Sequence, residues 1–224
     1  INTVFFNECV LLLQIQSTNI MDIKDKIAIV TGSSKGIGLE TCKMLLEAGA
    51  RVAGWSRSET KIKHSNFINI NVDVQEFESV KSAYEKTVSH FDGEVSVLIN
   101  NAGLGYEGYL ESFDIDKWKT MFATNVDGIF YTSKLVLPNM RKNREGHIVN
   151  ISSIAGLEGI PTMSGYCATK HAVRGLSHSL YKEVRDYGVK VTCIYPGSVK
   201  TNFFDDIDSV NLSDNMMRPQ DIAE

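Results

Sequence analysis

Tyr166 and Lys170 are the residues whose types and spacing point most directly to chemistry, and they lie four apart in a predicted amphipathic helix. Because residues four apart share one helix face, the lysine charge can stabilise a phenolate beside it. A free phenol titrates at about pH 10, so a tyrosine that exchanges protons near neutrality needs such a charge. Ser153, thirteen residues before the tyrosine at the end of a predicted strand, adds a hydroxyl. This set suits proton transfer to a substrate oxygen, although by itself the Tyr166/Lys170 pair is also compatible with a solvated helix face.

A glycine-rich turn, TGSSKGIG at residues 31–38, is the second pattern, and it lies between a predicted strand and a predicted helix. Gly32 permits a tight exit from the strand, Gly36 lets the backbone approach a pyrophosphate, and Gly38 lets the helix pack closely on the sheet. A glycine turn alone is compatible with a plain tight turn. Its strand-turn-helix context favours a dinucleotide-binding site.

The end of the second predicted strand bears on which dinucleotide would bind. NAD-selective sites place an acidic residue there, where it accepts hydrogen bonds from the ribose 2′-OH. This chain has Ser56 and Arg57 at that point and Lys35 in the glycine turn, so two cations can converge on a 2′-phosphate. The pattern predicts NADP(H) and, because cells keep that pool mostly reduced, ketone reduction. The alternative is that both cations are solvated surface charges.

Short β-branched runs alternate with amphipathic helical patterns from residue 26 onward, as a parallel sheet covered on both faces requires. The predicted strands are residues 26–31, 51–56, 67–71, 95–100, 147–152 and 189–195. The predicted helices are residues 36–50, 77–91, 116–142 and 166–188. The fold class is therefore α/β: one doubly wound parallel sheet in a three-layer α/β/α Rossmann domain, with strand order 3-2-1-4-5-6.

Composition excludes several classes of protein. The chain has 224 residues, of which 43% are apolar and 22% charged, as is ordinary for a globular domain. Its net charge of -4 lacks the attraction to phosphate polyanions that nucleic-acid binding needs, so no nucleic-acid partner is predicted. Four dispersed cysteines indicate neither a metal site nor a disulfide framework, which favours a reducing, cytoplasmic location. No apolar run is long enough to span a membrane.

Residues 1–20 are an apolar leader, and Met21 then begins a polar stretch. One interpretation is that Met21 is the biological start and that the leader is non-native; the other is an added interfacial or oligomer-contact segment. Residues 21–224 form the single predicted domain, because no internal repeat or linker interrupts them.

The motifs together resemble the short-chain dehydrogenases/reductases, of the carbonyl or 3-oxoacyl reductase kind, from about Met21 to Glu224. Several independent motifs occur in the family's order, which makes the resemblance specific. Family members usually continue past residues 219–223 into a helix and a seventh strand, so the domain is expected to lack its C-terminal strand. The matching motifs are the turn at 31–38, Asp73-Val74, Asn100-Asn101-Ala102-Gly103, Asn125, Ser153, Tyr166 with Lys170, and Pro196-Gly197 followed by Val199 and Thr201.

The resemblance implies an oxidoreductase that transfers a hydride between NADP(H) and a ketone or secondary alcohol. Tyr166 would protonate the carbonyl oxygen and Ser153 would hydrogen-bond it. Lys170 would also hold the nicotinamide ribose, and Asn125 would anchor a water-linked proton path. The implied cofactor-binding residues are Gly32, Ser34, Lys35, Gly36, Ile37, Gly38, Ser56, Arg57, Asp73, Val74, Asn101, Ala102, Gly103, Tyr166, Lys170, Pro196, Gly197, Val199 and Thr201.

Several of these assignments have an alternative interpretation. In the alternative, Asn125 caps or packs in its helix, and Asp73 is a strand-end turn residue. For the serine, the alternative is that Ser152 faces the site in place of Ser153. The whole protein alternatively binds NADP(H) as a sensor or structural partner without turnover. Filled catalytic positions favour the enzyme.

Apolar residues predict the substrate pocket and self-association. Loops after the last three strands should bring an apolar lining to a small-molecule carbonyl substrate: Leu104, Tyr106, Leu157, Ile160, Met163, Phe203, Phe204 and Met216. Two helices carry more apolar surface than one sheet face can cover, which predicts a homodimer or homotetramer. The residues concerned are Trp118, Met121, Phe122, Ile129, Phe130, Tyr131, Val173, Leu176 and Leu180.

Overall fold

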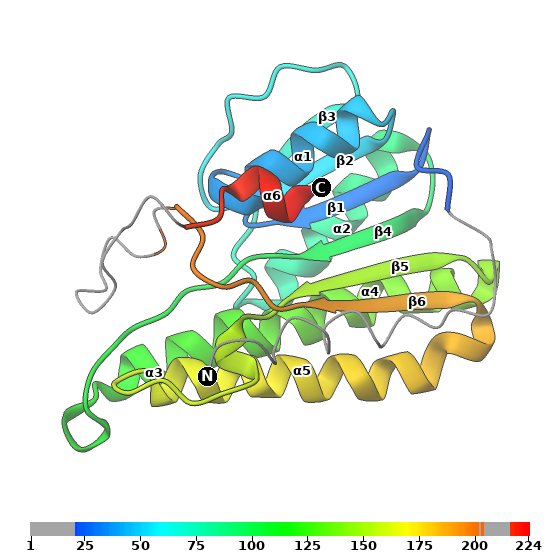
Figure 1. Ribbon diagram of the computed structural model, residues 1–224. Coiled ribbons are helices and arrows are strands. Elements are labelled where there is room, and N and C mark those ends of the chain that lie inside the picture. The colour runs from blue at the N-terminus through cyan, green and yellow to red at the C-terminus, as the bar shows by residue number, and fades with distance from the viewer. Residues whose placement is uncertain (1–20, 202, 204–215) are drawn as a thin grey trace.

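The computed structural model describes residues 21–201, 203 and 216–224, and its centre is a six-stranded parallel sheet (Figure 1). The strand order is β3-β2-β1-β4-β5-β6, which confirms the prediction. The order reverses between β1 and β4, where such sheets open a crevice beyond the carboxyl ends of the strands. The strands are β1 (Ile27–Thr31), β2 (Arg51–Ser56), β3 (Phe67–Asn71), β4 (Val95–Asn100), β5 (Gly146–Ile151) and β6 (Val189–Ile194).

Helices cover both faces of the sheet, because alternate strand residues point to opposite sides. Val30 of β1 joins the core cluster under α1, and Ile29 joins the larger cluster under α2, α4 and α5. In Figure 1, α1 and α6 lie together on one side of the sheet, with α2 and α4 on the other. The helices are α1 (Gly36–Glu47), α2 (Phe77–Phe91), α3 (Ile115–Phe122), α4 (Gly128–Asn143), α5 (Ser164–Val184) and α6 (Pro219–Ala223).

The predicted helix over residues 116–142 is helical throughout, but it contains a π-helical turn that the prediction did not include. The segment forms α3, then a π-helical turn, η2 (Ala123–Asp127), and then α4. A π-turn adds a residue to one turn and so changes which side chains face inward. Asn125 in this turn is fully buried, and Gly128 after it packs so closely on Val74 that an added Cβ would lie 3.1 Å from the valine side chain. The π-turn therefore directs the side-chain amide of Asn125 into the interior.

The predicted apolar surplus on the two long helices is only partly present. Four of the residues are buried in the core, because these helices pack on the sheet and on each other: Met121, Ile129, Val173 and Leu180. The open apolar surface lies on α4 and α5. There Phe130 is 50% exposed, and Leu137 and Leu176 help to line a hollow of about 630 Å³ between the helices.

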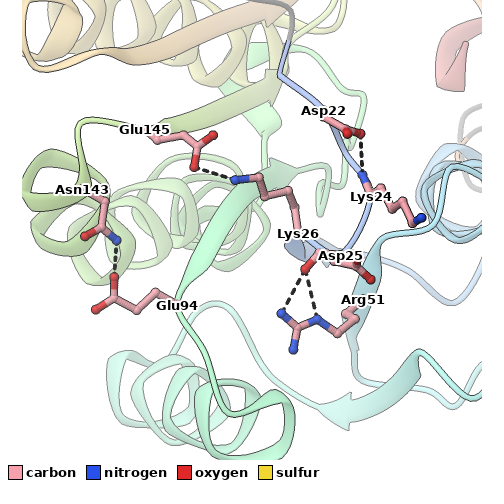
Figure 2. A network of polar contacts seen from close by, with 8 residues as sticks. All are labelled: Asp22, Lys24, Asp25, Lys26, Arg51, Glu94, Asn143 and Glu145. Carbon is pink, nitrogen blue, oxygen red and sulfur yellow. Dashed lines mark hydrogen bonds and ion pairs between the residues drawn. The ribbon is translucent and has the colours of Figure 1, made fainter.

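The amino ends of the strands are closed by polar contacts (Figure 2). Lys26 Nζ contacts Glu145 Oε2 at 2.6 Å, which joins the start of β1 to the loop before β5. Arg51, at the start of β2, donates to the backbone oxygens of Asp25 and Phe91. Asn143 donates to Glu94. These contacts join the amino ends of the strands, at the end of the sheet opposite the crevice.

Within the described ranges, no helix is long and apolar enough to cross a membrane. No three His, Cys, Asp or Glu side chains of these residues group as metal ligands do. Cys42, Cys167 and Cys193 are free thiols, and burial raises the pKa of Cys42 to about 12. The leader at residues 1–20 lies outside the described residues.

Candidate active site

The four predicted catalytic residues meet beyond the carboxyl ends of β4 and β5. Tyr166 and Lys170 lie in the first two turns of α5, Ser153 precedes the short turn η3 (Ile154–Gly156), and Asn125 lies in η2. Lys170 Nζ is 5.6 Å from the centre of the Tyr166 ring. Gly103 fits between two of these groups, since a Cβ on it would lie 3.4 Å from Asn125 Oδ1 and 3.6 Å from Lys170 Nζ. The structure thus brings together residues from three separate segments.

Tyr166 is buried, and burial raises the pKa of its phenol above the ordinary value. A hydrogen bond with Ser153 acts in the opposite direction, and Lys170 is not among the groups that shift this pKa. The sequence predicted that the charge of Lys170, not the hydroxyl of Ser153, would lower the pKa of this phenol. Ser153 Oγ also accepts from the Ala155 N–H at 3.2 Å, which leaves its hydroxyl proton to be donated. The pair therefore presents a protonated phenol and a hydroxyl donor.

Lys170 is buried, and burial lowers the pKa of its ammonium to about 8. Its Nζ donates to the Ile151 carbonyl at 2.9 Å. Among the described residues this is its one hydrogen bond, so two of the three ammonium N–H groups can serve a ligand hydroxyl. The lysine is held as a donor at the junction of β5 and α5.

Asn125 joins the segment after β4 to α5. Its side chain pairs with the backbone of Leu104 in both directions, accepting from the N–H at 2.9 Å and donating to the carbonyl at 2.8 Å. It also donates to Thr169 Oγ1 at 3.0 Å, and that hydroxyl donates to the Tyr166 carbonyl at 2.8 Å. These bonds give Asn125 a packing and positioning role. Its part in a water-linked proton path stays a prediction.

The geometry favours Ser153 over Ser152 as the serine that faces the substrate. Ser152 Oγ is buried and donates to the Lys170 carbonyl at 3.1 Å, so it holds β5 to the α5 backbone. Ser153 is the serine that contacts the Tyr166 phenol. Because successive residues of an extended segment point in opposite directions, only one of the two can reach the tyrosine.

The glycine turn has the shape that a dinucleotide requires. Gly32 and Gly36 have φ of 66° and 57°, a conformation that favours glycine. A Cβ on Gly38 would lie 2.4 Å from the Gly32 carbonyl oxygen, so only glycine fits there. Lys35 caps α1 without a side-chain hydrogen bond, which leaves the first N–H groups of the helix for an anion. These residues fit a pyrophosphate.

Other predicted cofactor residues surround this turn. Asn101 Nδ2 donates to the Thr31 and Gly32 carbonyls, which fixes the segment after β4 against the turn. A Cβ on Gly36 would lie 3.2 Å from Thr201 Cγ2, so Thr201 covers the turn. The Pro196 carbonyl accepts from Ile154 N, which brings the end of β6 beside the Ser153 turn. Gly197 faces open space, and Val199 is buried where it bridges to Met217.

The residues around the predicted adenosine end are placed unevenly. Lys35 and Arg57 are exposed, whereas Ser56 is buried and its hydroxyl contacts Ser33 Oγ and the Ser58 carbonyl. Asp73 Oδ1 accepts from Gln75 N at 3.0 Å, so in this structure Asp73 has the turn contact of its alternative interpretation. Ser34, Ile37 and Val74 lie in the turn, in the first turn of α1 and after β3 respectively.

Apolar side chains surround Tyr166. Phe203 lies with its ring centre 5.5 Å from that of Tyr166. Five predicted lining residues belong to the cluster around Tyr166: Leu104, Tyr106, Ile160, Met163 and Phe203. Leu157 is 42% exposed, Met216 is half-buried outside this cluster, and Phe204 lies outside the described residues.

The family comparison decides what this arrangement belongs to: the short chain dehydrogenase pattern matches residues 26–211. The chain belongs to the short-chain dehydrogenase/reductase family. It is 39% identical over 202 residues to 3-ketodihydrosphingosine reductase of Bacteroides thetaiotaomicron, covering 90% of this chain and 73% of that protein. The structure of ElxO with NADP bound is 31% identical, with a TM-score of 0.81, covering 89% of this chain and 88% of that one. The 3-ketoacyl-(acyl-carrier-protein) reductase of Brucella melitensis complexed with NADH shares the fold, with a TM-score of 0.84 at 23% identity and coverage of 90% and 88%.

A buried polar network in this short-chain dehydrogenase/reductase was not predicted from the sequence. Asn100 and Asn150 are paired at the ends of β4 and β5, and Asn100 Nδ2 donates to Asn150 Oδ1 at 2.8 Å. Thr132 of α4 donates to Asn100 Oδ1, and Asn150 Nδ2 donates to Ser177 of α5. The signal for it was available, because both predicted strands carry asparagine at an otherwise apolar end.

Proposed function

We propose that this short-chain dehydrogenase/reductase uses NADP(H) to reduce an apolar ketone to a secondary alcohol. The observation that carries the proposal is the buried Tyr166 phenol, kept protonated by burial and in contact with Ser153. A phenol of raised pKa is a proton donor at neutral pH, and the second hydroxyl can share the same substrate oxygen. The similar reductase of Bacteroides thetaiotaomicron is named for a ketone substrate, which agrees in reaction type.

The chain's own residues orient the substrate and move one proton. When bound, the nicotinamide cofactor supplies the hydride. Ser153 and Tyr166 donate hydrogen bonds to the carbonyl oxygen, which polarises it and stabilises the negative charge that develops there. The proton on Tyr166 Oη passes to that oxygen and completes the alcohol. Ser153, whose hydrogen bond lowers the pKa of the phenol, favours the resulting phenolate, and Lys170, buried beside the ring, holds a ligand hydroxyl with its remaining N–H groups.

The preference for NADP(H) rests on the charges at the end of β2. Arg57 is exposed just after the strand, Lys35 is exposed in the glycine turn, and no acid occupies the strand end. Two cations attract a 2′-phosphate, and the missing carboxylate removes the group that would repel it. We expect wild type to bind NADPH more tightly than NADH and Arg57→Ala to lose that difference. Equal affinities of wild type for the two cofactors contradict the assignment.

The activity itself is tested by NADPH oxidation at 340 nm against a panel of ketones. Turnover that requires both protein and ketone supports the reductase. Tight binding of NADPH with no turnover across the panel favours the sensor or structural function. The three free cysteines of the described residues agree with a reducing, cytoplasmic location, which stays a prediction.

The open apolar face of α4 and α5 supports self-association. Phe130 is half exposed there, and Tyr181 is 45% exposed on α5. A two-fold axis across this face would bury both side chains against a second copy, so we expect at least a dimer. Phe130→Asp should dissociate it. A wild-type protein that sediments as a monomer at micromolar concentration contradicts this expectation.

A further inference from the structure

The most exposed large apolar side chains of the described residues are close together in sequence. Ile115, Tyr109 and Leu110 are 69%, 68% and 66% exposed, and the next, Phe130, is 50% exposed. Tyr109 and Leu110 lie in the segment between β4 and α3, and Ile115 is the first residue of α3; the segment extends beyond the carboxyl ends of the strands at the lower left of Figure 1. Single exposed apolar residues need no explanation, but a group of this kind marks a binding surface.

The same segment leads to Tyr166. Its inward residues Leu104, Tyr106 and Phe113 pack in the apolar cluster around the catalytic tyrosine. A Cβ on Gly105 would lie 3.1 Å from the Tyr166 ring, which places the start of the segment against the phenol. Apolar groups therefore continue from the tyrosine along residues 104–115 to the exposed side chains.

The backbone holds these side chains in fixed positions. Gly108 N donates to the Thr162 carbonyl at 2.8 Å, which ties the segment to the loop before α5. Leu110–Ser112 form the 3-10 turn η1, and Phe113 N donates to the Leu110 carbonyl. Asp114 caps α3 by accepting from two backbone N–H groups at 2.8 Å. An apolar group held in water by an ordered segment is prepared to contact a ligand.

Charges around the segment favour a slender ligand over an extended surface. Glu111 and Asp116 are exposed among the apolar residues and oppose an anionic bilayer. Lys117 is exposed as well, and its Nζ lies 5.2 Å from the centre of the Tyr106 ring, so a positive charge also borders the apolar residues. An alkyl chain suits such a surface better than a bilayer does, because it needs only a narrow apolar strip beside the charges.

We propose that Tyr109, Leu110 and Ile115 form a subsite for the alkyl chain of a long-chain ketone whose carbonyl lies at Tyr166. This substrate class rests on the proposed reductase function. The carbonyl end is reduced at the tyrosine, and the chain runs outward along residues 104–115. Each methylene that leaves water on this surface raises kcat/KM by up to about fourfold.

The test is a series of straight-chain methyl ketones from butanone to decanone with NADPH. We expect kcat/KM to rise with chain length in wild type. Leu110→Ser and Tyr109→Ser should lower kcat/KM for decanone by about tenfold and change that for butanone by less than about twofold. Tyr187→Ser is the matched control, because Tyr187 is 38% exposed in η4 (Arg185–Tyr187), remote in sequence from the segment.

The outcomes separate the two proposals. No reduction of any ketone in the series, with NADPH bound, contradicts the reductase function itself. Reduction with a flat dependence on chain length overturns the subsite alone. A rise with chain length that Leu110→Ser and Tyr109→Ser leave unchanged also overturns it. So does a loss of self-association in these variants at unchanged kcat/KM, which would assign the surface to a second copy.

Discussion

Replacing Lys170 by methionine should stabilise the protein without added cofactor at neutral pH. Burial lowers the pKa of Lys170 from its ordinary 10.5 to about 8. Since one pKa unit corresponds to about 1.4 kcal/mol, the charged lysine costs the folded state about 3 kcal/mol. Methionine removes this cost and also the hydrogen bond to the Ile151 carbonyl, which contributes about 2 kcal/mol. The net expectation at pH 7 is a variant more stable by about 1 kcal/mol.

The sign of the pH dependence follows from the lowered pKa. Below about pH 8 the lysine is charged in both states, so the folded state bears the full cost. Between about 8 and 10.5 the folded state releases its proton first, and the unfolded state binds more protons. Stability of wild type relative to the variant therefore rises with pH, by about 2 to 3 kcal/mol from pH 7 to pH 10. The order of the two proteins should reverse.

The assay is urea unfolding followed by circular dichroism at pH 7 and pH 10, at one fixed protein concentration. Lys182→Met is the matched control, because Lys182 is exposed on the same helix. Its difference from wild type should stay within about 0.5 kcal/mol at both pH values. A Lys170→Met variant that is less stable than wild type by the same amount at both pH values refutes the reasoning.

Three further substitutions test the site and its support. Gly38→Ala should weaken cofactor binding at least about tenfold in a fluorescence titration, because its Cβ would lie 2.4 Å from a carbonyl oxygen of the glycine turn. Asn100→Ala leaves buried amide and hydroxyl partners unpaired, so thermal unfolding should show a loss of about 2 kcal/mol, or about 4–8 °C. Ser153→Ala should lower kcat at least about 100-fold, whereas Ser152→Ala should change kcat little and cost about 1 kcal/mol of stability. Equal losses of kcat in the two serine variants would contradict the assignment of Ser153.

The sheet could be predicted because its signals are local and repeated. Each strand is a short apolar run between turn residues, and the βα alternation restricts the order to very few arrangements. The glycine turn was predictable for the same reason, since Gly32, Gly36 and Gly38 each satisfy a requirement of the backbone nearby.

The features that were not predicted depend on contacts between distant segments. Apolar periodicity continues through residues 116–142, so the local sequence does not indicate the π-turn that buries Asn125. The partners of Asn125 and Asn100 lie about twenty to fifty positions away in sequence. Met121 and Ile129 are likewise buried by packing between elements, which the apolar pattern of a single helix does not predict. Sequence spacing predicted the candidate catalytic set, and tertiary contacts determine which of its atoms are free to bind a ligand.

The most direct test of proton donation by Tyr166 is the turnover of Tyr166→Phe beside its affinity for NADPH. The substitution removes one hydroxyl from a buried ring, so the packing with Phe203 should persist. We predict that kcat for ketone reduction falls at least about 100-fold while the Kd for NADPH changes less than about threefold. Turnover at the wild-type rate with NADPH bound equally well would show that another group supplies the proton.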